Sequence, residues 1–280
     1  MIKLSRILLF VLFLGVIGSA WAEQDEKLSK SNQAMIHEKR QKIEDEIAQL
    51  KDHPWAGRYY FGDGLGANVS LTLAPENGFT VTWFGCMGLY DQNHGTVDWD
   101  GNVVKLSFAF DLGEGFIGYY DAEYKPIHWG ERLYLIPANK IVPFCNVVNS
   151  RSEPRNDVHG FFFLRRDDEK KEAKGKPELP EEFMPYLLDE PVDAAIVSVK
   201  DIRGNGNRKI ATIIVNKGKK DGLLPGMELY VVKPDRVYAR VILTKVEETQ
   251  SEGEFILYDV LKTPTPVGGW QLSTCPSWRR

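Results

Sequence analysis

Cysteine and histidine are scarce in this 280-residue sequence, and their spacing excludes the familiar metal and redox motifs. The three cysteines, Cys86, Cys145 and Cys275, are far apart, whereas zinc ligands and redox pairs follow one another closely. The five histidines are scattered as well, and none belongs to a metal-binding or nucleophile motif. We therefore expect no metal, no cofactor and no catalytic residues, and we favour a non-enzymatic protein.

A hydrolase whose site forms only in the folded chain stays an alternative, because all-β folds host such enzymes and a sequence can hide their sites. In that case Asp63, His94 and His128 are the first residues to substitute. Loss of a defined activity would support the alternative.

Positive charge is not in excess either, since 35 Lys and Arg residues stand against 39 Asp and Glu residues, a formal charge of −4. Two basic residues and no acidic ones lie within the first 22 positions, so removal of this segment leaves 33 basic against 39 acidic residues, or about −6. Nucleic-acid binding requires a positive footprint. We therefore expect no nucleic-acid partner.

A long hydrophobic run is also missing, because the apolar stretch from Ile7 to Ile17 is too short to span a bilayer comfortably. Lys3 and Arg6 precede it, and Ala20-Trp21-Ala22 places small residues at the two positions that determine cleavage. This pattern predicts a signal peptide and a periplasmic or secreted protein without an integral span after cleavage. A retained membrane anchor is the alternative, and no cysteine follows the run to carry a lipid.

The segment from Lys27 to Lys51 has the apolar spacing of an amphipathic helix. His53-Pro54 ends it, because the residue before a proline is pushed out of the α region. The helix either packs on the following domain or binds a partner as a coiled segment, although its stripe covers too few heptads to specify a coiled coil. The stripe consists of Ile36, Ile43, Ile47 and Leu50.

Beyond this helix, apolar and polar residues alternate in four short runs, 69–73, 79–83, 97–99 and 104–110, which places the apolar side chains of each predicted strand on one face. The turn Pro75-Glu76-Asn77-Gly78 separates the first two strands, and Asp100-Gly101-Asn102 separates the next two. Four antiparallel strands with one apolar face must curl or close to bury that face. The pattern predicts a β-meander or small barrel.

The residues at the start of this domain carry a resemblance. Trp55-Ala56-Gly57-Arg58-Tyr59-Tyr60, followed by a meander, resembles the lipocalin-like barrels of exported bacterial proteins. The stretch up to Arg166, with its segment Trp83-Phe84-Gly85-Cys86, resembles an uncharacterised family of secreted Gram-negative proteins. A lipocalin-like fold would imply a carrier of a small apolar ligand. Its cavity would be lined by aromatic side chains that otherwise simply fill the core: Phe79, Trp83, Trp99 and Phe108.

From Arg165 to Glu182 the composition changes to charged residues, glycine and proline, with Leu179 as the one large aliphatic residue. This composition is typical of a solvated linker. Five short strands follow without a clear helix, which favours a second compact barrel. They are Ile196 to Val199, Ile210 to Val215, Glu228 to Val232, Val237 to Val246 and Glu254 to Tyr258.

The loop from Gly218 to Met227 lacks the ending of a phosphate-binding loop. It resembles the loop of small C-terminal barrels in envelope assembly proteins of the flagellum and the rod-shape machinery. That resemblance implies a protein-interaction module without chemistry of its own. The expected partner is therefore an envelope protein or a cell-wall component.

Two further sets of residues give site predictions. We favour a disulfide between Cys86 and Cys145, because both fall in the first folded segment and an oxidising compartment permits a bridge. Between Lys200 and Lys220 basic residues outnumber acidic ones, which makes this segment either a solubilising surface or an anion-binding one. The anion-binding candidates are Arg203, Arg208, Lys209, Lys219 and Lys220.

The sequence therefore predicts an all-β fold of two small β-barrel or β-meander domains, preceded by one N-terminal amphipathic helix. The divisions are a signal peptide (1–22), an N-terminal helix (23–53), a β-meander or barrel domain (54–166), a charged linker (167–185) and a small β-barrel domain (186–280). The predicted function is that of an exported non-enzymatic binding or assembly component of the bacterial cell envelope. The carrier and the hydrolase are the alternatives.

Overall fold

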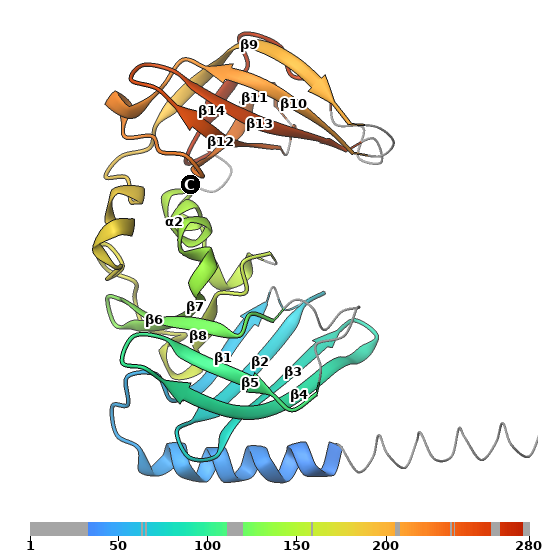
Figure 1. The fold of residues 1–280 in the computed structure, drawn as a ribbon, viewed down its shortest axis with the longest axis vertical. Helices are drawn as coiled ribbons and strands as arrows, with labels where there is room; N and C mark the ends of the chain where they lie inside the picture. Colours follow the sequence, from blue (N-terminus) through green and yellow to red (C-terminus); the bar gives the residue numbers. More distant parts are fainter. Residues whose placement is uncertain are drawn as a thin grey trace, which may run out of the picture.

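The computed structural model describes residues 33–276, apart from 63, 65, 111–119, 158, 205–207, 236, 238 and 259–263. The predicted signal peptide, residues 23–32 and Asp63 lie outside these residues. Within them the chain forms two closed β-barrels, as predicted (Figure 1). No described helix is long and apolar enough to cross a membrane.

The first barrel is an antiparallel meander whose strands follow one another around the barrel in sequence order. Pairing of Tyr59 with Arg165 closes it, by joining the first strand to the last. The predicted strands lie within this sheet, although the strand before Trp99 begins much earlier than expected, at Gly88. The strands are β1 (Gly57–Gly62), β2 (Asn68–Ala74), β3 (Gly78–Gly85), β4 (Gly88–Trp99), β5 (Val104–Phe108), β6 (Glu123–Trp129), β7 (Arg132–Pro137) and β8 (Phe163–Arg165).

Apolar and polar residues that alternate in the sequence point into and out of this barrel, respectively. Val69, Leu71 and Leu73 point into the core and are almost completely buried, as period-two spacing requires. The turn between β2 and β3 requires glycine at position 78. The φ of Gly78 is +74°, and a Cβ atom there would lie only 2.1 Å from the carbonyl oxygen of Gly95.

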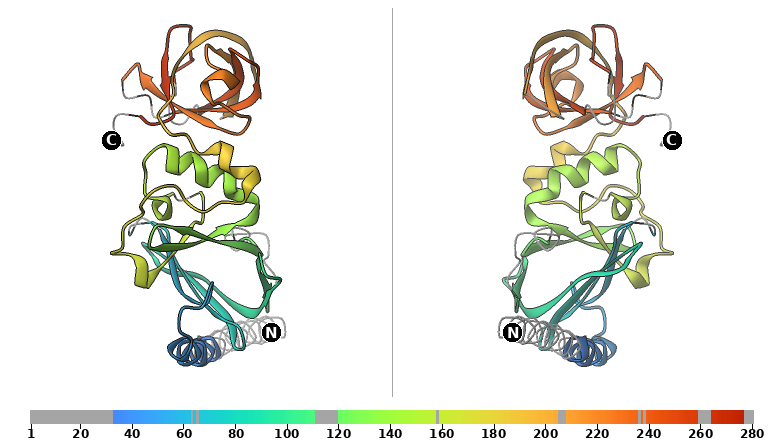
Figure 2. Two further views of the ribbon diagram at one scale, coloured as in Figure 1. Left: turned by 90° about the vertical axis from the view of Figure 1, so that its left-hand side faces the viewer. Right: turned by 90° about the vertical axis from the view of Figure 1, so that its right-hand side faces the viewer.

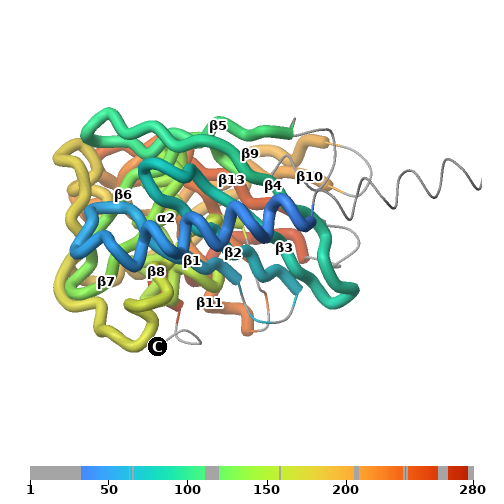
Figure 3. Tube along the Cα trace, turned by 90° about the horizontal axis from the view of Figure 1, so that it is seen from below, coloured from blue at the N-terminus to red at the C-terminus, as the bar shows by residue number. Residues whose placement is uncertain are grey.

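An α-helix formed by residues 33–49 lies against the outer surface of the first barrel (Figure 3). The helix side chains Ile36 and Ile43, which belong to the predicted apolar stripe, are buried. Glu46 fastens the helix to the β2–β3 turn, because its carboxylate accepts hydrogen bonds from the backbone N–H groups of Glu76 and Asn77, both at 2.9 Å. The helix is therefore packed on the barrel, as the simpler of the two readings expected.

A second helix, α2 (Ile141–Asn149), was not predicted and lies between the two barrels (Figure 2). The part of the chain predicted as a solvated linker is largely exposed, yet Leu179, Phe183 and the following Tyr186 pack against the apolar cluster of α2. Short 3-10 helices complete the connections: η2 (Ala138–Lys140), η3 (Pro154–Asn156), η4 (Arg166–Asp168), η5 (Glu181–Tyr186) and η6 (Lys219–Asp221).

The second barrel closes in the order β10-β13-β12-β11-β14-β9. Its five predicted strands are present, and the short β14, which sequence alone did not reveal, pairs with both β11 and β9 and so closes the barrel. The strands are β9 (Asp193–Arg203), β10 (Arg208–Val215), β11 (Glu228–Lys233), β12 (Arg240–Val246), β13 (Ser251–Tyr258) and β14 (Gln271–Ser273).

Candidate binding cleft between the two barrels

Helix α2 joins the barrels through side-chain amides that use both of their polar atoms. The Asn146 Nδ2 donates to the Gly226 carbonyl at 2.9 Å, and its Oδ1 accepts from the Glu228 N–H at 3.2 Å. Asn149 holds the linker in the same way, through the Tyr186 carbonyl and the Leu188 N–H. One face of α2 thus fixes the second barrel and the linker to the first domain.

The end of α2 directs the chain into the cleft through a strained residue. The N–H of Ser152 bonds to the Val147 carbonyl at 3.2 Å and the N–H of Arg151 to the Val148 carbonyl at 2.9 Å, which together form a Schellman motif. The left-handed position of this motif usually holds glycine, but here it holds Arg151 with a φ of +57°. A side chain in this conformation costs about 1–2 kcal/mol, so arginine is less favourable at this position than glycine would be.

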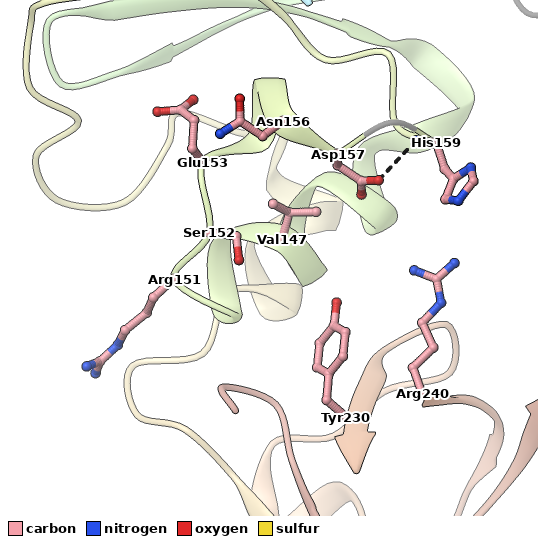
Figure 4. A pocket seen from close by; sticks show the side chains of 9 residues that line it. All are labelled: Val147, Arg151, Ser152, Glu153, Asn156, Asp157, His159, Tyr230 and Arg240. Atoms are coloured by element: carbon pink, nitrogen blue, oxygen red, sulfur yellow. Dashed lines mark hydrogen bonds between the residues drawn. The ribbon is translucent and has the colours of Figure 1, made fainter. Parts of the chain in front are cut away.

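An open cleft of about 490 Å³ lies beside this joint, between the second barrel and the segment that follows α2 (Figure 4). One wall comes from the segment after α2 and the other from strands β11 and β12 of the second barrel. Nine side chains line it, and all except Val147 are polar or charged. The polar and charged ones are Arg151, Ser152, Glu153, Asn156, Asp157, His159, Tyr230 and Arg240. This composition suits a polar ligand or a polar protein segment.

Two acidic side chains at the cleft are already neutralised. Glu153 accepts hydrogen bonds from the guanidinium of Arg132 at 2.7 Å and from the hydroxyl of Tyr134 at 2.9 Å. Glu228, behind the lining, accepts from Arg240 at 3.1 Å and from Tyr230 at 3.0 Å. Burial raises the pKa of Glu228, although the charge of Arg240 and the hydrogen bond from Tyr230 act in the opposite direction.

Other polar groups at the cleft are uncommitted. Among the described residues, the side chains of Arg151, Asn156 and His159 make no hydrogen bond or ion pair. Figure 4 shows His159 and Arg240 facing each other from opposite walls, with Asp157 beside them. Asp157 accepts one hydrogen bond from the backbone N–H of His159, at 3.1 Å. The cleft therefore offers both donors and acceptors.

The structure does not form the predicted Cys86–Cys145 disulfide, and all three cysteines are free thiols. Cys86 is exposed in the turn between β3 and β4, whereas Cys145 is enclosed in the apolar cluster of α2, where burial raises the pKa of its thiol to about 12. Cys275 is buried as well and donates a weak hydrogen bond to the Ser150 carbonyl at 3.6 Å. The two predicted partners are therefore in different places, because Cys86 is on the surface and Cys145 is in the interior.

The predicted anion-binding residues do not gather on one surface. Arg203, Arg208 and Lys209 lie at one end of the β9–β10 pair, whereas Lys219 and Lys220 follow the opposite end of β10. A strand of this length separates its ends by roughly 20 Å. Arg203 is also occupied, because it pairs with Glu254 and donates to Thr212.

The residues singled out for a hydrolase are not brought together either. His94 lies on β4 under the N-terminal helix, where burial and the nearby Lys39 lower its pKa. His128 is exposed on β6, and Asp63 lies outside the described residues. Within the part of the chain that the structure covers, no three His, Cys, Asp or Glu side chains form a group that could hold a metal ion.

Aromatic rings pack across the interior of the first barrel. Phe79, Trp83, Trp99 and Phe108 belong to its core or pack against it. The rings of Phe61 and Phe161 stack with their centroids 4.7 Å apart, and those of Phe79 and Phe108 meet edge to face at 5.0 Å. Of the four rings that would have lined a carrier's cavity, Phe79 and Phe108 contact each other, whereas Trp83 packs against Phe161 and Trp99 against Trp55.

The lining of the cleft was missed because its residues come from two domains that sequence reasoning treated separately. The run Arg151 to Asp157 is polar between two apolar stretches, and this is the one signal that could have marked it. Comparisons with models of known protein families, with curated proteins and with solved structures find no match. The geometry of the cleft is therefore the basis for a functional conclusion.

Proposed function

We propose that this protein is an exported, non-enzymatic binding or assembly component of the bacterial cell envelope, and that its partner is a protein segment or cell-wall component held in the cleft between the barrels. Export follows from the N-terminal sequence pattern of a basic start, an apolar run and a small-residue cleavage site. In this proposal the working form of the protein begins near Glu23 and resides in the periplasm or outside the cell.

The observation that carries the proposal is the set of uncommitted polar side chains in a cleft between the second barrel and the segment after α2. Arg151 keeps an unfavourable backbone conformation at the edge of the cleft, where its exposed side chain points outward, and His159 lies opposite Arg240 across the cleft (Figure 4). Strain of this kind persists where surrounding structure or function maintains it. The packed interior of the first barrel supports this reading over a carrier of small apolar ligands.

A cross-linking experiment in intact cell envelopes tests the proposal. The tagged protein is cross-linked, purified and analysed by mass spectrometry as wild type and as the double variant Arg151→Gly/His159→Ala. We expect partners of the wild type to be lost from the double variant. Glycine relieves the left-handed strain at position 151 and stabilises the fold by about 1 kcal/mol, so unfolding cannot explain the loss.

The matched control is Arg208→Ala/His128→Ala, which removes one arginine and one histidine that are exposed away from the cleft. This control should keep its cross-linked partners. Equal recovery of the same partners by all three proteins would contradict the cleft as the binding site. Recovery of the chain from the cytoplasm, with residues 1–22 still attached, would contradict the envelope role.

A further inference from the structure

Strand β9 extends well past the short strand that pairs with it at the closure of the second barrel. β14 pairs only with Asp193–Ala195, and the last backbone hydrogen bond on that side joins the Gly269 N–H to the Ile196 carbonyl at 2.8 Å. Among the residues that the structure describes, only those of β10 hydrogen-bond to the backbone of Ser198–Arg203. We call residues 198–203 the free edge.

Two side chains of the free edge point toward the inner face of the barrel. Val199 lies opposite the buried Ile213 of β10, and Ile202 lies opposite the buried Ala211. Residues directly opposite each other in an antiparallel pair share a face of the sheet. The register shifts between these two pairs, because a β-bulge adds one residue to β9. The two inward residues are therefore three positions apart.

The other four residues of the free edge point outward. Arg203 donates to the Thr212 hydroxyl at 2.7 Å and pairs with Glu254. Lys200 pairs with Glu252, and both glutamates alternate along β13 with buried residues. The order of directions along the free edge is thus outward, inward, outward, outward, inward, outward, which reads the same from either end. The outward residues are Ser198, Lys200, Asp201 and Arg203.

This order makes the free edge complementary to itself. In an antiparallel pair of two copies with a two-fold axis between residues 200 and 201, Lys200 of each copy lies opposite Asp201 of the other. Val199 then lies opposite Ile202, and the members of every pair share a face. An axis moved by half a residue sets Lys200 opposite itself or Asp201 opposite itself, and like charges repel. One register is therefore favoured.

The charges of the free edge do not prevent this pairing. Edge strands are often protected by unpaired lysine side chains, which keep other strands away. Here Lys200 and Arg203 already have acidic partners on β13, so the edge carries no excess of positive charge. Ile202 is 46% exposed, and pairing would bury more of its apolar surface.

We propose that two copies of this chain dimerise by pairing their free edges, which joins the two second barrels through one antiparallel sheet. The unpaired backbone N–H and C=O groups of each copy hydrogen-bond to those of the other. A strand of a different protein would use these backbone groups alone, whereas a second copy also satisfies the charge pattern.

Pairing at the free edge leaves the cleft accessible. β9 lies at the end of the second barrel that is farthest from the first barrel (Figure 1). The second barrel contributes Tyr230 of β11 and Arg240 of β12 to the cleft. Dimerisation and cleft binding are therefore independent properties, and the failure of one leaves the other standing.

Sedimentation velocity of the exported chain tests the proposal. A reducing agent is present throughout, so that the exposed Cys86 cannot link two copies. We expect the wild type to change from monomer to dimer as its concentration rises, with a dissociation constant of roughly 10–100 µM, because a contact of this size is small. A wild type that stays monomeric at several times that concentration would overturn the proposal and leave the edge open to a strand of another protein.

Charge reversal tests the register. Asp201→Lys places lysines opposite each other at the axis, and Lys200→Asp places aspartates there, so each variant alone should dimerise at least about tenfold more weakly than the wild type. An equal mixture of the two variants restores both Lys–Asp pairs. The mixture should therefore form a heterodimer about as strong as the wild-type dimer, which also shows that both variants are folded.

The matched controls are Asp235→Lys and Lys220→Asp, which make the same charge changes at exposed positions of the second domain outside β9. Each control should dimerise as the wild type does. The proposal is overturned if the reversal variants dimerise as strongly as the controls. It is also overturned if their mixture is no stronger than either variant alone.

Hydrogen exchange locates the contact independently. We expect backbone amides of residues 198–203 to exchange more slowly at a concentration that favours the dimer than at one that favours the monomer. Equal exchange of these amides in a sample that sediments as a dimer would place the contact elsewhere and overturn the proposal.

Discussion

The carboxylate of Asp168 is fully buried where the first barrel closes. It pairs with Arg165 at 2.8 Å and with Lys171 at 2.7 Å, and it accepts the backbone N–H of Leu133 at 3.0 Å. Burial alone would raise its pKa, but the hydrogen bonds and charges of the two cations outweigh burial and lower the pKa below its usual value. Asp168 therefore ties β7 and β8 together as an anion.

The substitution Asp168→Asn should lower the free energy of unfolding by about 2 kcal/mol at pH 7, because it removes the charge from this buried network. A lowered folded-state pKa stabilises the protein fully above about pH 3.9, the unfolded value, and this contribution is lost as the pH falls through the folded pKa. Urea unfolding from pH 7 to pH 2.5 should show the difference between the two proteins shrinking below pH 4.

The control for this prediction is Asp167→Asn, whose carboxylate is 62% exposed in its pair with Arg58. An exposed pair contributes about 0–1 kcal/mol, so this variant should resemble the wild type at every pH. A destabilisation by Asp168→Asn that does not change between pH 7 and pH 3 would contradict the role of the ionised carboxylate.

At the scale of the elements, α2 holds the two barrels in register. Substitution of Asn146→Ala would leave the Gly226 carbonyl and the Glu228 N–H without their partner at a buried joint. The loss of stability should be about 2 kcal/mol. In calorimetry we expect a single transition of the wild type to broaden or split, because the barrels lose part of their coupling.

Asn156→Ala is the matched control for that experiment, because the Asn156 side chain is exposed and makes no hydrogen bond to the described residues. Its unfolding should follow that of the wild type. Identical calorimetric profiles for Asn146→Ala and Asn156→Ala would show that the amide of Asn146 does not couple the barrels.

The strands were predictable from sequence because each exposes one face and buries the other, as Val69, Leu71 and Leu73 illustrate. Helix α2 was not, because its residues are nearly all apolar and include several β-branched ones, which resemble a buried strand. Strand β14 is only three residues long and carries no period. The fold class was therefore within reach of sequence reasoning, while the joint that positions the cleft was not.

For the whole molecule, the packing of the linker on α2 predicts how a cut chain behaves. Trypsin should cleave first at the exposed Lys170, Lys171 and Lys174, which lie outside helices and strands. The two pieces should still elute together in size-exclusion chromatography, because Leu187 is buried in the α2 cluster and Phe183 and Tyr186 pack against it. Light scattering would then report the mass of the intact chain.

The variant Leu187→Asp should separate the pieces after the same cut, since a charge cannot be buried in the α2 cluster without a partner. Separate elution of the wild-type pieces under native conditions would contradict a packed linker. The composition of residues 165–185 predicts a linker between two cores. Composition could not reveal that Phe183, Tyr186 and Leu187 pack the end of this linker against α2.

The seam between β1 and β8 has a consequence for how the first barrel is made. A chain delivered from its N-terminus, whether by a ribosome or by an export channel, presents Tyr59 long before its partner Arg165. Until β8 has emerged, one edge of β1 has backbone N–H and C=O groups without hydrogen-bond partners, and such an edge can pair with strands of other chains. The first barrel can therefore close only after the whole domain has emerged, and the edge of β1 is most in need of protection by a chaperone during that interval.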